Sequence, residues 1–425
     1  MSLKKQLKKL QAFFDFYCLE VKRKVLLKQL CKKEKIKIVF LGYALGGSCD
    51  IFSKLYSEFK KDKRFEPYIV IVPNTYGTET EMLELLHQAQ NYLSSLQIPY
   101  ICGYDEKNKS FFDAKEEINP DIVFMCHHYD WFRKEFRIDN YLDKLVYITP
   151  YAYNLENHLN YHINTKAYNL AHKCFFETKK LIELWKKEAK NKRNICNEFY
   201  GYLKLDYLLD SEKQKKDPWK IKNPDIKRII WAPHHLDAPL SNFLEYKDLF
   251  LQLAHSNKKL QIAFRPHPGL KGSLKRIAKW SDEQVEHYWS EWEQADNGFV
   301  SEGSYNDLFF TSDAMILDSI SFIAEYLATN RPYLIQEPKQ KDFAFNSFTS
   351  NLLNILYKST SWEDIERFIE VVVCQGQDSK KGERRKFFLE NFISPYGRLA
   401  ANNIYQAVCS EIFLLNQTRK GKKDA

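Results

Sequence analysis

The sequence predicts an α/β protein with two Rossmann-like domains that face one another. From residue 36 onward, short apolar runs alternate with helical patterns, which is typical of βαβ units and a parallel sheet. A charged stretch with two prolines, residues 210–226, interrupts this alternation, which then restarts, so we expect an interdomain linker there. The length of 425 residues leaves room for two such domains of similar size.

Residues 1–35 form the first predicted element, a basic amphipathic helix. They contain eleven Lys or Arg against three acidic residues, a net charge of +8 in a chain of +9. Two interpretations remain open: the helix lies in the interface of an anionic membrane, or it packs on the body with its lysines solvated. Its apolar residues recur at helical spacing: Leu3, Leu7, Leu10, Phe14, Tyr17, Val21 and Val25.

The remaining charge argues against a nucleic-acid-binding protein. The tail 417–425 carries +3 and the body 36–416 only −2, whereas a nucleic-acid-binding body should spread basic charge over a groove. Basic ends on a near-neutral body suit an anionic surface. The nine cysteines form no C-x-x-C pattern, and neither a signal peptide nor a membrane-spanning run is recognisable, so we expect reduced thiols in a cytosolic protein.

Residues 36–209 are predicted to form the first domain and residues 227–385 the second. The segment 386–425 contains a last helix, Gly397–Leu415, which we expect to return to the first domain. The main strands are expected at Ile36–Leu41, Tyr68–Val72, Ile122–Met125, Leu145–Ile148 and Cys174–Phe176, then at Ile229–Ala232, Leu260–Phe264, Ala314–Leu317 and Tyr333–Ile335. The main helices between them are expected at Ile51–Phe59, Glu79–Leu96, Phe243–His255, Ser281–Ala295 and Phe322–Ala328.

Three segments of the second domain place polar groups directly after a strand: Trp231-Ala-Pro-His234-His235, Phe264-Arg265-Pro-His267-Pro268 and Asp318-Ser319-Ile-Ser321. Ligands of open α/β sheets bind outside the carboxyl ends of the strands. We therefore expect the ligand site at these three segments.

The third segment is expected to start a helix around Ser319–Ser321, where free N–H groups and a hydroxyl can bind phosphate. Glu325, one turn later, could reach a ribose or an acceptor hydroxyl. The simpler alternative is that Asp318 and Ser319 merely cap the helix, and for this segment alone it is favoured. In the second segment, two prolines hold His267 extended, so that it can donate to a phosphate oxygen. Two alternatives stay open for Arg265: it binds the phosphate instead, or it pairs with a carboxylate.

Histidine pairs are weak evidence for a metal. His234 and His235 are adjacent, so only one of them should face the cleft, and the same holds for His127 and His128. His158 and His162 could chelate on a helix, but no third ligand stands out. We assign no metal. The loop Gly42–Gly47 lacks G-x-G-x-x-G spacing, so it is a weak dinucleotide signal and equally fits an acceptor cleft.

Together these motifs resemble the CDP-glycerol glycerophosphotransferase family, which comprises teichoic-acid polymerases and primases and their capsule-synthesis relatives. The resemblance covers residues 225–340, with weaker echoes at Gly201-Tyr-Leu-Lys-Leu-Asp206 and in the C-terminal helix. It rests on the order and spacing of Ala232-Pro233-His234, Arg265-Pro266-His267-Pro268, Asp307-Leu308, Ser312-Asp313, Asp318-Ser-Ile-Ser321, Glu325-Tyr326 and Arg331-Pro332.

The resemblance implies a GT-B architecture in which the first domain binds the acceptor and the second the donor. It implies transfer of glycerol phosphate, or a related polyol phosphate, from a CDP-activated donor to a lipid-linked or polysaccharide acceptor, with release of CMP and without a cofactor. It also implies a cytoplasmic protein attached peripherally to the inner face of the membrane.

The resemblance also implies roles for individual residues. His267 and Ser321 would hold the donor diphosphate, and Asp318 would support the loop. Glu325 would sit near the nucleoside or polyol. The donor site would further include His234, Arg265 and Ser319.

The chain departs from the family's pattern in three places. The family's Asp-Tyr-Ser-Ser is Asp-Ser-Ile-Ser here, and its Pro-Thr-Phe-Arg is Pro-His-His-Leu. Its His-Gly-Thr-Pro loop, thought to supply a base, has no counterpart, so His128 or His127 is the candidate base. Two alternatives stay open: a glycosyltransferase of the same fold that uses a nucleotide sugar, and a catalytically inactive scaffold that binds polymer or a partner.

Overall fold

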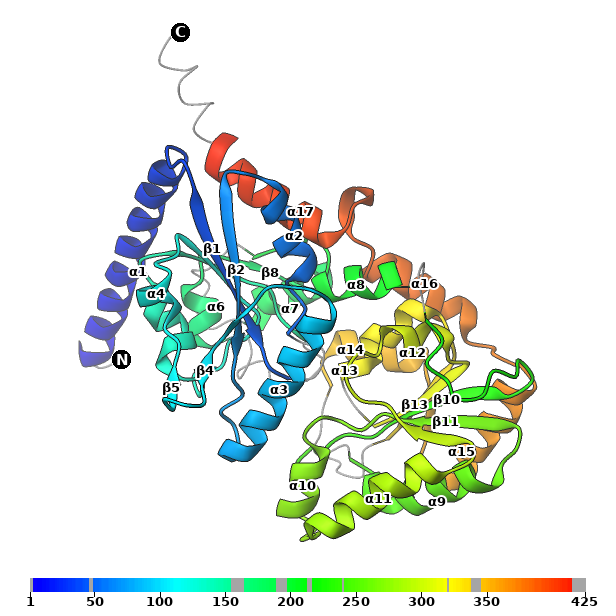
Figure 1. Ribbon diagram of the computed structural model, residues 1–425. Coiled ribbons are helices and arrows are strands. Elements are labelled where there is room, and N and C mark those ends of the chain that lie inside the picture. Colours follow the sequence, from blue (N-terminus) through cyan, green and yellow to red (C-terminus); the bar gives the residue numbers. More distant parts are fainter. Residues whose placement is uncertain are drawn as a thin grey trace. The chain divides into compact units, whose positions relative to one another are not determined.

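The described residues of the computed structural model form two compact units (Figure 1). The structure describes residues 3–45, 49–153, 164–188, 197–211, 216–238, 241–318, 321–337 and 345–414. The first unit contains the described residues up to 151, residues 164–206 and residues 394–414, and the second contains residues 207–393 with residues 152 and 153. The chain thus leaves the first unit for residues 207–393 and returns to it at residue 394.

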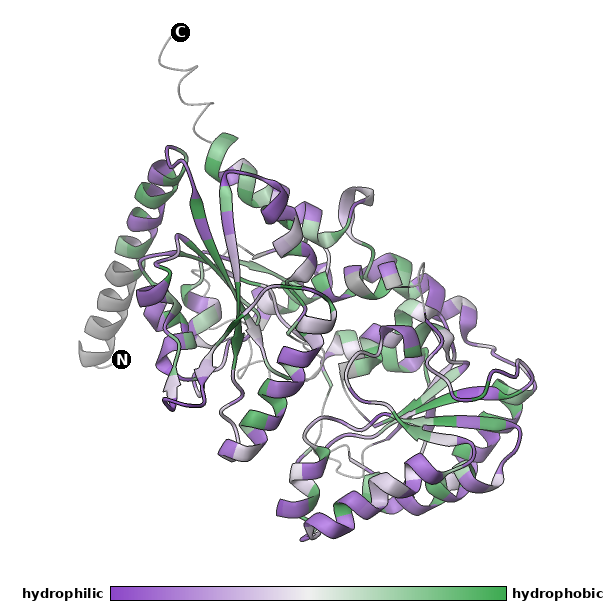
Figure 2. Cartoon of the chain, viewed as in Figure 1, coloured by the Kyte–Doolittle hydropathy of each residue, from purple (hydrophilic) through white to green (hydrophobic). Residues whose placement is uncertain are grey.

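The first unit is built on a seven-stranded parallel sheet. Its strand order is β3-β2-β1-β6-β7-β8-β9, so the order reverses between β1 and β6. The strands are β1 (Ile36–Tyr43), β2 (Phe65–Val72), β3 (Ile101–Cys102), β6 (Ile122–Met125), β7 (Leu145–Ile148), β8 (Lys173–Phe175) and β9 (Asn197–Glu198). The central strands are buried on both faces, which explains why they are apolar almost throughout. Figure 2 shows this concentration of hydrophobic residues in the strands.

Helices and a small hairpin complete the first unit. Thr78 and Glu81 form a capping box that fixes the start of α3. The helices are α1 (Leu3–Leu30), α2 (Ser53–Lys61), α3 (Glu79–Ser95), α4 (Ala114–Glu117), α6 (Lys166–Leu170), α7 (Lys179–Glu188), α8 (Leu203–Ser211) and α17 (Ala400–Cys409), which continues to Leu414. The hairpin pairs β4 (Tyr104–Asp105) with β5 (Ser110–Phe111). Within the described ranges, no helix is both long enough and apolar enough to cross a bilayer.

The second unit is built on a six-stranded parallel sheet. Its strand order, β12-β11-β10-β13-β14-β15, reverses between β10 and β13. The strands are β10 (Lys227–Ala232), β11 (Leu260–Phe264), β12 (Gly298–Val300), β13 (Ala314–Leu317), β14 (Tyr333–Gln336) and β15 (Tyr357–Ser359). The helices are α9 (Phe243–Ser256), α10 (Leu270–Arg276), α11 (Asp282–Gln294), α12 (Asn306–Thr311), α13 (Ser321–Glu325), α14 (Ser347–Asn354), α15 (Trp362–Arg367) and α16 (Lys381–Asn391).

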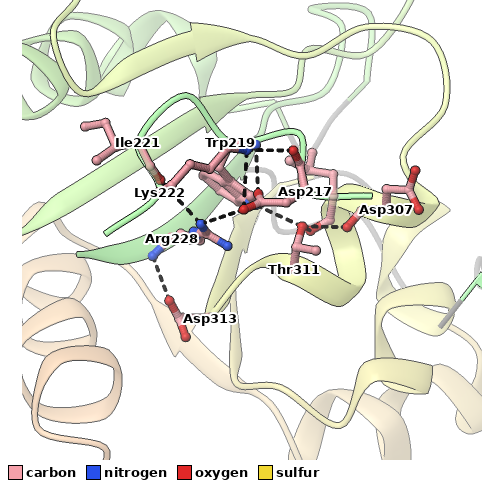
Figure 3. Close-up of polar contacts among 9 residues, drawn as sticks. Asp217, Trp219, Ile221, Lys222, Arg228, Asp307, Thr311 and Asp313 are labelled. Carbon is pink, nitrogen blue, oxygen red and sulfur yellow. Dashed lines mark hydrogen bonds and ion pairs between the residues drawn. The ribbon is translucent and has the colours of Figure 1, made fainter. Parts of the chain in front are cut away.

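Part of the predicted linker belongs to the second unit (Figure 3). The indole of Trp219 is buried, and its Nε1 donates to Thr311 Oγ1 at 2.9 Å. Asp217 Oδ2 accepts from the Arg228 guanidinium at 3.0 Å, and Arg228 also donates to the Ile221 carbonyl at 3.3 Å. The structure therefore departs from the linker prediction over residues 216–226, because these contacts fix the segment to β10 and α12 of the second unit.

The C-terminal helix α17 is held in the first unit by a buried carboxylate. Asp206 accepts hydrogen bonds from the backbone N–H groups of Ala400 at 2.8 Å and Ala401 at 2.7 Å, in the first turn of α17. Close packing continues at Gly201, whose φ is +99° and where an added Cβ would lie 2.0 Å from Ser394 Oγ. The Gly201–Asp206 segment thus caps a helix that is nearly 200 residues away in the sequence.

Candidate active site

The three predicted segments follow β10, β11 and β13, which are neighbours in the second sheet. The rings of His234 and His267 are stacked with centroids 4.5 Å apart, and His235 lies 4.7 Å from His267. Both members of the His234–His235 pair therefore contact His267, which corrects the expectation that they point in opposite directions. That expectation assumed an extended chain, whereas a turn begins at His235.

His267 is held in one orientation by the backbone around it. The backbone N–H of His267 donates to the Pro233 carbonyl at 3.0 Å, and its ring nitrogen Nδ1 accepts from the backbone N–H of Gly269 at 3.0 Å. Burial holds the pKa of His267 well below its usual range, so the ring is neutral at physiological pH. Because Nδ1 is an acceptor, the single ring proton lies on Nε2. His267 thus presents one N–H donor.

The three histidines are also the one group of His, Cys, Asp or Glu among the described residues that could hold a metal, with one nitrogen from each lying within 4.8 Å of the others. A metal on Nε2 of His267 requires a protonated Nδ1. The Gly269 N–H already points at Nδ1, so the two donors would repel. This geometry favours a hydrogen bond from His267 to a ligand over ligation of a metal.

Asp318 fixes the loop that carries His234. The carboxylate is buried and accepts from the N–H of His234 at 2.5 Å and from the N–H of Asn242 at 2.6 Å. Burial raises the pKa of Asp318 to about 7, although the two hydrogen bonds favour the ionised form. Both carboxylate oxygens bind backbone N–H groups, so they position the loop.

Arg265 and Glu325 belong to a buried polar network. Arg265 donates to the carbonyls of Ser301 at 2.9 Å and of Gly303, and its guanidinium lies over the ring of Tyr305. Glu325 accepts from the hydroxyl of Tyr305 at 2.5 Å. These contacts hold the loop after β12. Glu325 is buried, and the role predicted for it at the ligand stays a prediction.

The serine segment is described only in part. Ser319 lies outside the described residues, as do His158 and His162, and the side chain of Ser321 is likewise outside them. The backbone shows that α13 begins at Ser321, directly after β13. The roles predicted for Ser319 and Ser321 stay predictions.

The two candidate bases of the first unit follow β6. His127 is buried against Phe132, and its Nε2 donates to the Phe136 carbonyl at 2.8 Å. Because Nε2 carries the proton donated to Phe136, Nδ1 is the nitrogen that could accept a second proton. Burial lowers the pKa of His127 to about 4. The ring of His128 lies 4.2 Å from that of Tyr129 and 5.0 Å from that of Tyr168.

Comparison with known proteins identifies the family. The model of CDP-Glycerol:Poly(glycerophosphate) glycerophosphotransferase matches residues 165–410, more than half of the chain. The chain belongs to this family. The matched range includes the three clustered histidines, His234, His235 and His267, as well as Asp206 and α17. A search of curated proteins gave no match.

Solved structures show the fold of this glycerophosphotransferase. The wall teichoic acid polymerase TagF, soaked with CDPG, matches with 13% identity and a TM-score of 0.54 over 97% of this chain and 98% of that chain. S. aureus MnaA with UDP matches with 14% identity and a TM-score of 0.55 over 88% and 96%. The UDP-GlcNAc 2-epimerase of Neisseria meningitidis matches with 15% identity and a TM-score of 0.52 over 89% and 99%. The predicted GT-B-like fold is confirmed.

Sequence analysis missed three features of these sites. The hydrogen bond from the Asn242 N–H to Asp318 and that from Tyr305 to Glu325 depend on tertiary contacts. No local sequence pattern indicates either of them. The hydrogen bond from the Gly269 N–H to His267 could have been predicted. A glycine two residues after a loop histidine can turn its N–H back toward the imidazole ring.

Proposed function

We propose that this glycerophosphotransferase moves glycerol phosphate, or a related polyol phosphate, from a CDP-activated donor to a lipid-linked or polysaccharide acceptor of a cell-surface polymer. An acceptor hydroxyl attacks the phosphorus that bears the polyol. The new O–P bond forms while the bond from that phosphorus to CMP breaks. The hydroxyl proton passes to a base, and CMP leaves.

The observation that carries this proposal is the orientation of His267. Among the described residues its Nε2–H has no hydrogen-bond partner, and the neutral, half-buried ring is fixed by the Gly269 N–H. Phosphoryl transfer depends mainly on positioning and on stabilising negative charge. A donor that needs no reorientation is suited to a diphosphate oxygen. The N–H groups at the start of α13 would add to this stabilisation.

His128 is the base that we favour. His127 already uses its Nε2 on the Phe136 carbonyl, and burial holds its pKa near 4, so it accepts a proton poorly at neutral pH. His128 follows the same strand, and its ring lies beside the rings of Tyr129 and Tyr168. We expect His128→Gln to lower turnover without changing the KM for the donor.

The nucleotide released tests the proposal. The purified protein is incubated with CDP-glycerol, CDP-ribitol and UDP-sugars in turn, and the products are separated by chromatography. We expect CMP from a CDP-polyol in the presence of acceptor. Release of UDP from a UDP-sugar would instead support the glycosyltransferase alternative. The scaffold alternative predicts that none of these nucleotides gives a thermal shift.

We further propose that α1 attaches the protein to the inner face of the cytoplasmic membrane. One face of α1 packs on the first unit: Leu19 and Leu30 are buried, and the buried Arg23 donates to the Leu170 carbonyl. Tyr17, Val21 and Val25, four residues apart, are exposed. Both interpretations of the helix therefore have support, each for a different face.

Charge supports a membrane as the partner of the exposed face. The exposed residues Lys22, Lys24 and Lys28 share this part of α1 with the apolar row. Each basic residue near an anionic surface contributes about 1 kcal/mol, and a buried apolar row adds to it.

Point variants test this attachment better than a truncation, because removing α1 would also remove the packed face. We expect Val21→Glu with Val25→Glu to abolish co-sedimentation with anionic vesicles and to leave the melting temperature unchanged. Leu244→Glu, at an exposed leucine of α9, is the matched control. Sedimentation of the double variant at the wild-type level would contradict the proposal.

A further inference from the structure

We infer that an aromatic platform on the first unit binds a sugar ring of the acceptor. The platform consists of Tyr43, Tyr76, Tyr129, Trp131 and Phe132. The inference rests on the proposed transfer reaction and adds the chemical class of its acceptor: a chain that ends in a pyranose, as opposed to a bare poly(glycerol phosphate).

The platform has a buried layer and an exposed layer. Phe132 and Tyr43 are buried, with ring centroids 5.1 Å apart in an edge-to-face contact. Trp131 stacks on Phe132 at 4.2 Å and on Tyr129 at 5.6 Å. Tyr76 lies 5.7 Å from Trp131. The side chains of Trp131 and Tyr76 are 41% and 70% exposed, so the buried rings hold them while their outer surfaces remain open.

The position of the platform is that of a ligand site. Tyr43 ends β1, and Tyr129, Trp131 and Phe132 follow β6. The strand order reverses between these two strands, and open α/β sheets bind their ligands outside the carboxyl ends at such a point. Tyr76 follows β2, and its backbone N–H donates to Asn74 Oδ1 at 3.0 Å, which holds the backbone of the loop that carries Tyr76.

The chemistry of the platform suits a pyranose. A pyranose presents a flat face of C–H groups, which packs on the electron-rich face of an aromatic ring, while its hydroxyls remain at the edge for polar groups. A glycerol phosphate chain has neither a ring nor an apolar face of that size. The exposed rings therefore suit a sugar better than a polyol phosphate chain.

The platform also lies beside the proposed base. The ring of Tyr129, which stacks on Trp131, is 4.2 Å from the ring of His128. A sugar on Trp131 and Tyr129 would therefore place a hydroxyl close to His128. Binding of the acceptor and removal of its proton would take place on the same side of the first sheet.

Binding without turnover tests the inference first. Saturation-transfer NMR is recorded with cellobiose, chitobiose and CMP on the wild type, Trp131→Ala and Tyr76→Ala. Tyr396→Ala is the matched control, since Tyr396 is an exposed tyrosine (75%) outside the platform. We expect the disaccharide signals to be weaker in both platform variants than in the wild type and to be unchanged in the control. Tyr76→Ala remains informative if Trp131→Ala fails to fold, because Tyr76 is mostly exposed.

Kinetics test it second. We expect each platform variant to raise the KM for a pyranose-terminated acceptor roughly 2- to 10-fold, as the loss of one aromatic contact predicts. The KM for CDP-glycerol should stay unchanged, because the platform does not contact the donor in this proposal. For a glycerol phosphate oligomer, no such rise is expected.

Three results would overturn the inference: no disaccharide signal with the wild type, loss of the CMP signal in the platform variants, or equal rises in KM for both acceptors. If the wild type does not turn over CDP-glycerol, the proposed function fails, and the NMR comparison alone decides the sugar site.

Discussion

The orientation of His267 leads to opposite predictions for its two amide variants. In His267→Asn, Oδ1 takes the approximate place of Nδ1 and can still accept from the Gly269 N–H, but no atom replaces the Nε2–H donor. In His267→Gln, the terminal NH₂ can reach the place of that donor, while the acceptor for Gly269 is lost. The pair therefore separates the local turn from the contact with the donor.

The magnitudes follow from these two hydrogen bonds. Loss of one donor to a developing negative charge costs about 10²–10³-fold in rate. We expect this loss for His267→Asn, with a fold as stable as the wild type. Loss of one neutral backbone hydrogen bond costs about 1 kcal/mol. We expect this smaller effect on the stability of His267→Gln, which should keep a measurable part of the turnover.

The assay is CMP release from CDP-glycerol, combined with urea unfolding of each variant. His287→Asn and His287→Gln serve as controls, because His287 is exposed on α11. Turnover of His267→Asn near the wild-type level would refute the assignment of Nε2–H as the phosphate donor. Equal loss of activity in both amide variants, with intact folds, would refute the argument from the tautomer.

Three further predictions concern the rest of the chain. Ser321→Ala should raise the KM for the donor more than that for the acceptor, because α13 begins at this residue; steady-state kinetics showing the reverse would contradict it. Asp206→Ala leaves two buried N–H groups unpaired and should cost about 2–5 kcal/mol in urea unfolding, with Asp206→Asn losing about half of that; wild-type stability of both variants would disprove the capping role. Burial lowers the pKa of His127 to about 4 and that of His234 to about 3, and it holds the pKa of His267 well below its usual range. The neutral histidines therefore contribute fully to stability above pH 6.5, the pKa of the unfolded chain. This contribution is lost as the pH falls toward the pKa values of the folded protein, by about 1.4 kcal/mol per pH unit for each histidine. An unchanged urea midpoint between pH 7 and pH 5 would contradict this pH dependence.

The strands that sequence could predict are those buried on both faces. Ile122–Met125 and Leu260–Phe264 are apolar throughout because helices cover the sheets. The edge strands β3, β9, β12 and β15 have only two or three residues, too few for any periodicity. They exist because a neighbouring strand offers them hydrogen bonds, which sequence alone does not show.

The candidate site shows a similar division. Sequence alone could predict that the three motifs lie close together, because parallel strands place their carboxyl ends at one edge of a sheet. The partners of individual side chains could not be predicted. Glu325 accepts a hydrogen bond from Tyr305 in the interior, and that pairing depends on how α12 packs. Periodicity likewise revealed the apolar row of α1, whereas the contact of Arg23 with Leu170 set which face packs.

The return of the chain to the first unit has a consequence for synthesis on the ribosome. The second unit is a nearly continuous segment that is complete once residue 393 has emerged, whereas the first unit needs α17. Until then, the carboxylate of Asp206 has no N–H partners from Ala400 and Ala401, and α2 lacks the helix that packs against it. The half that begins first is therefore finished last, and its exposed apolar surface during that interval is where a chaperone would bind.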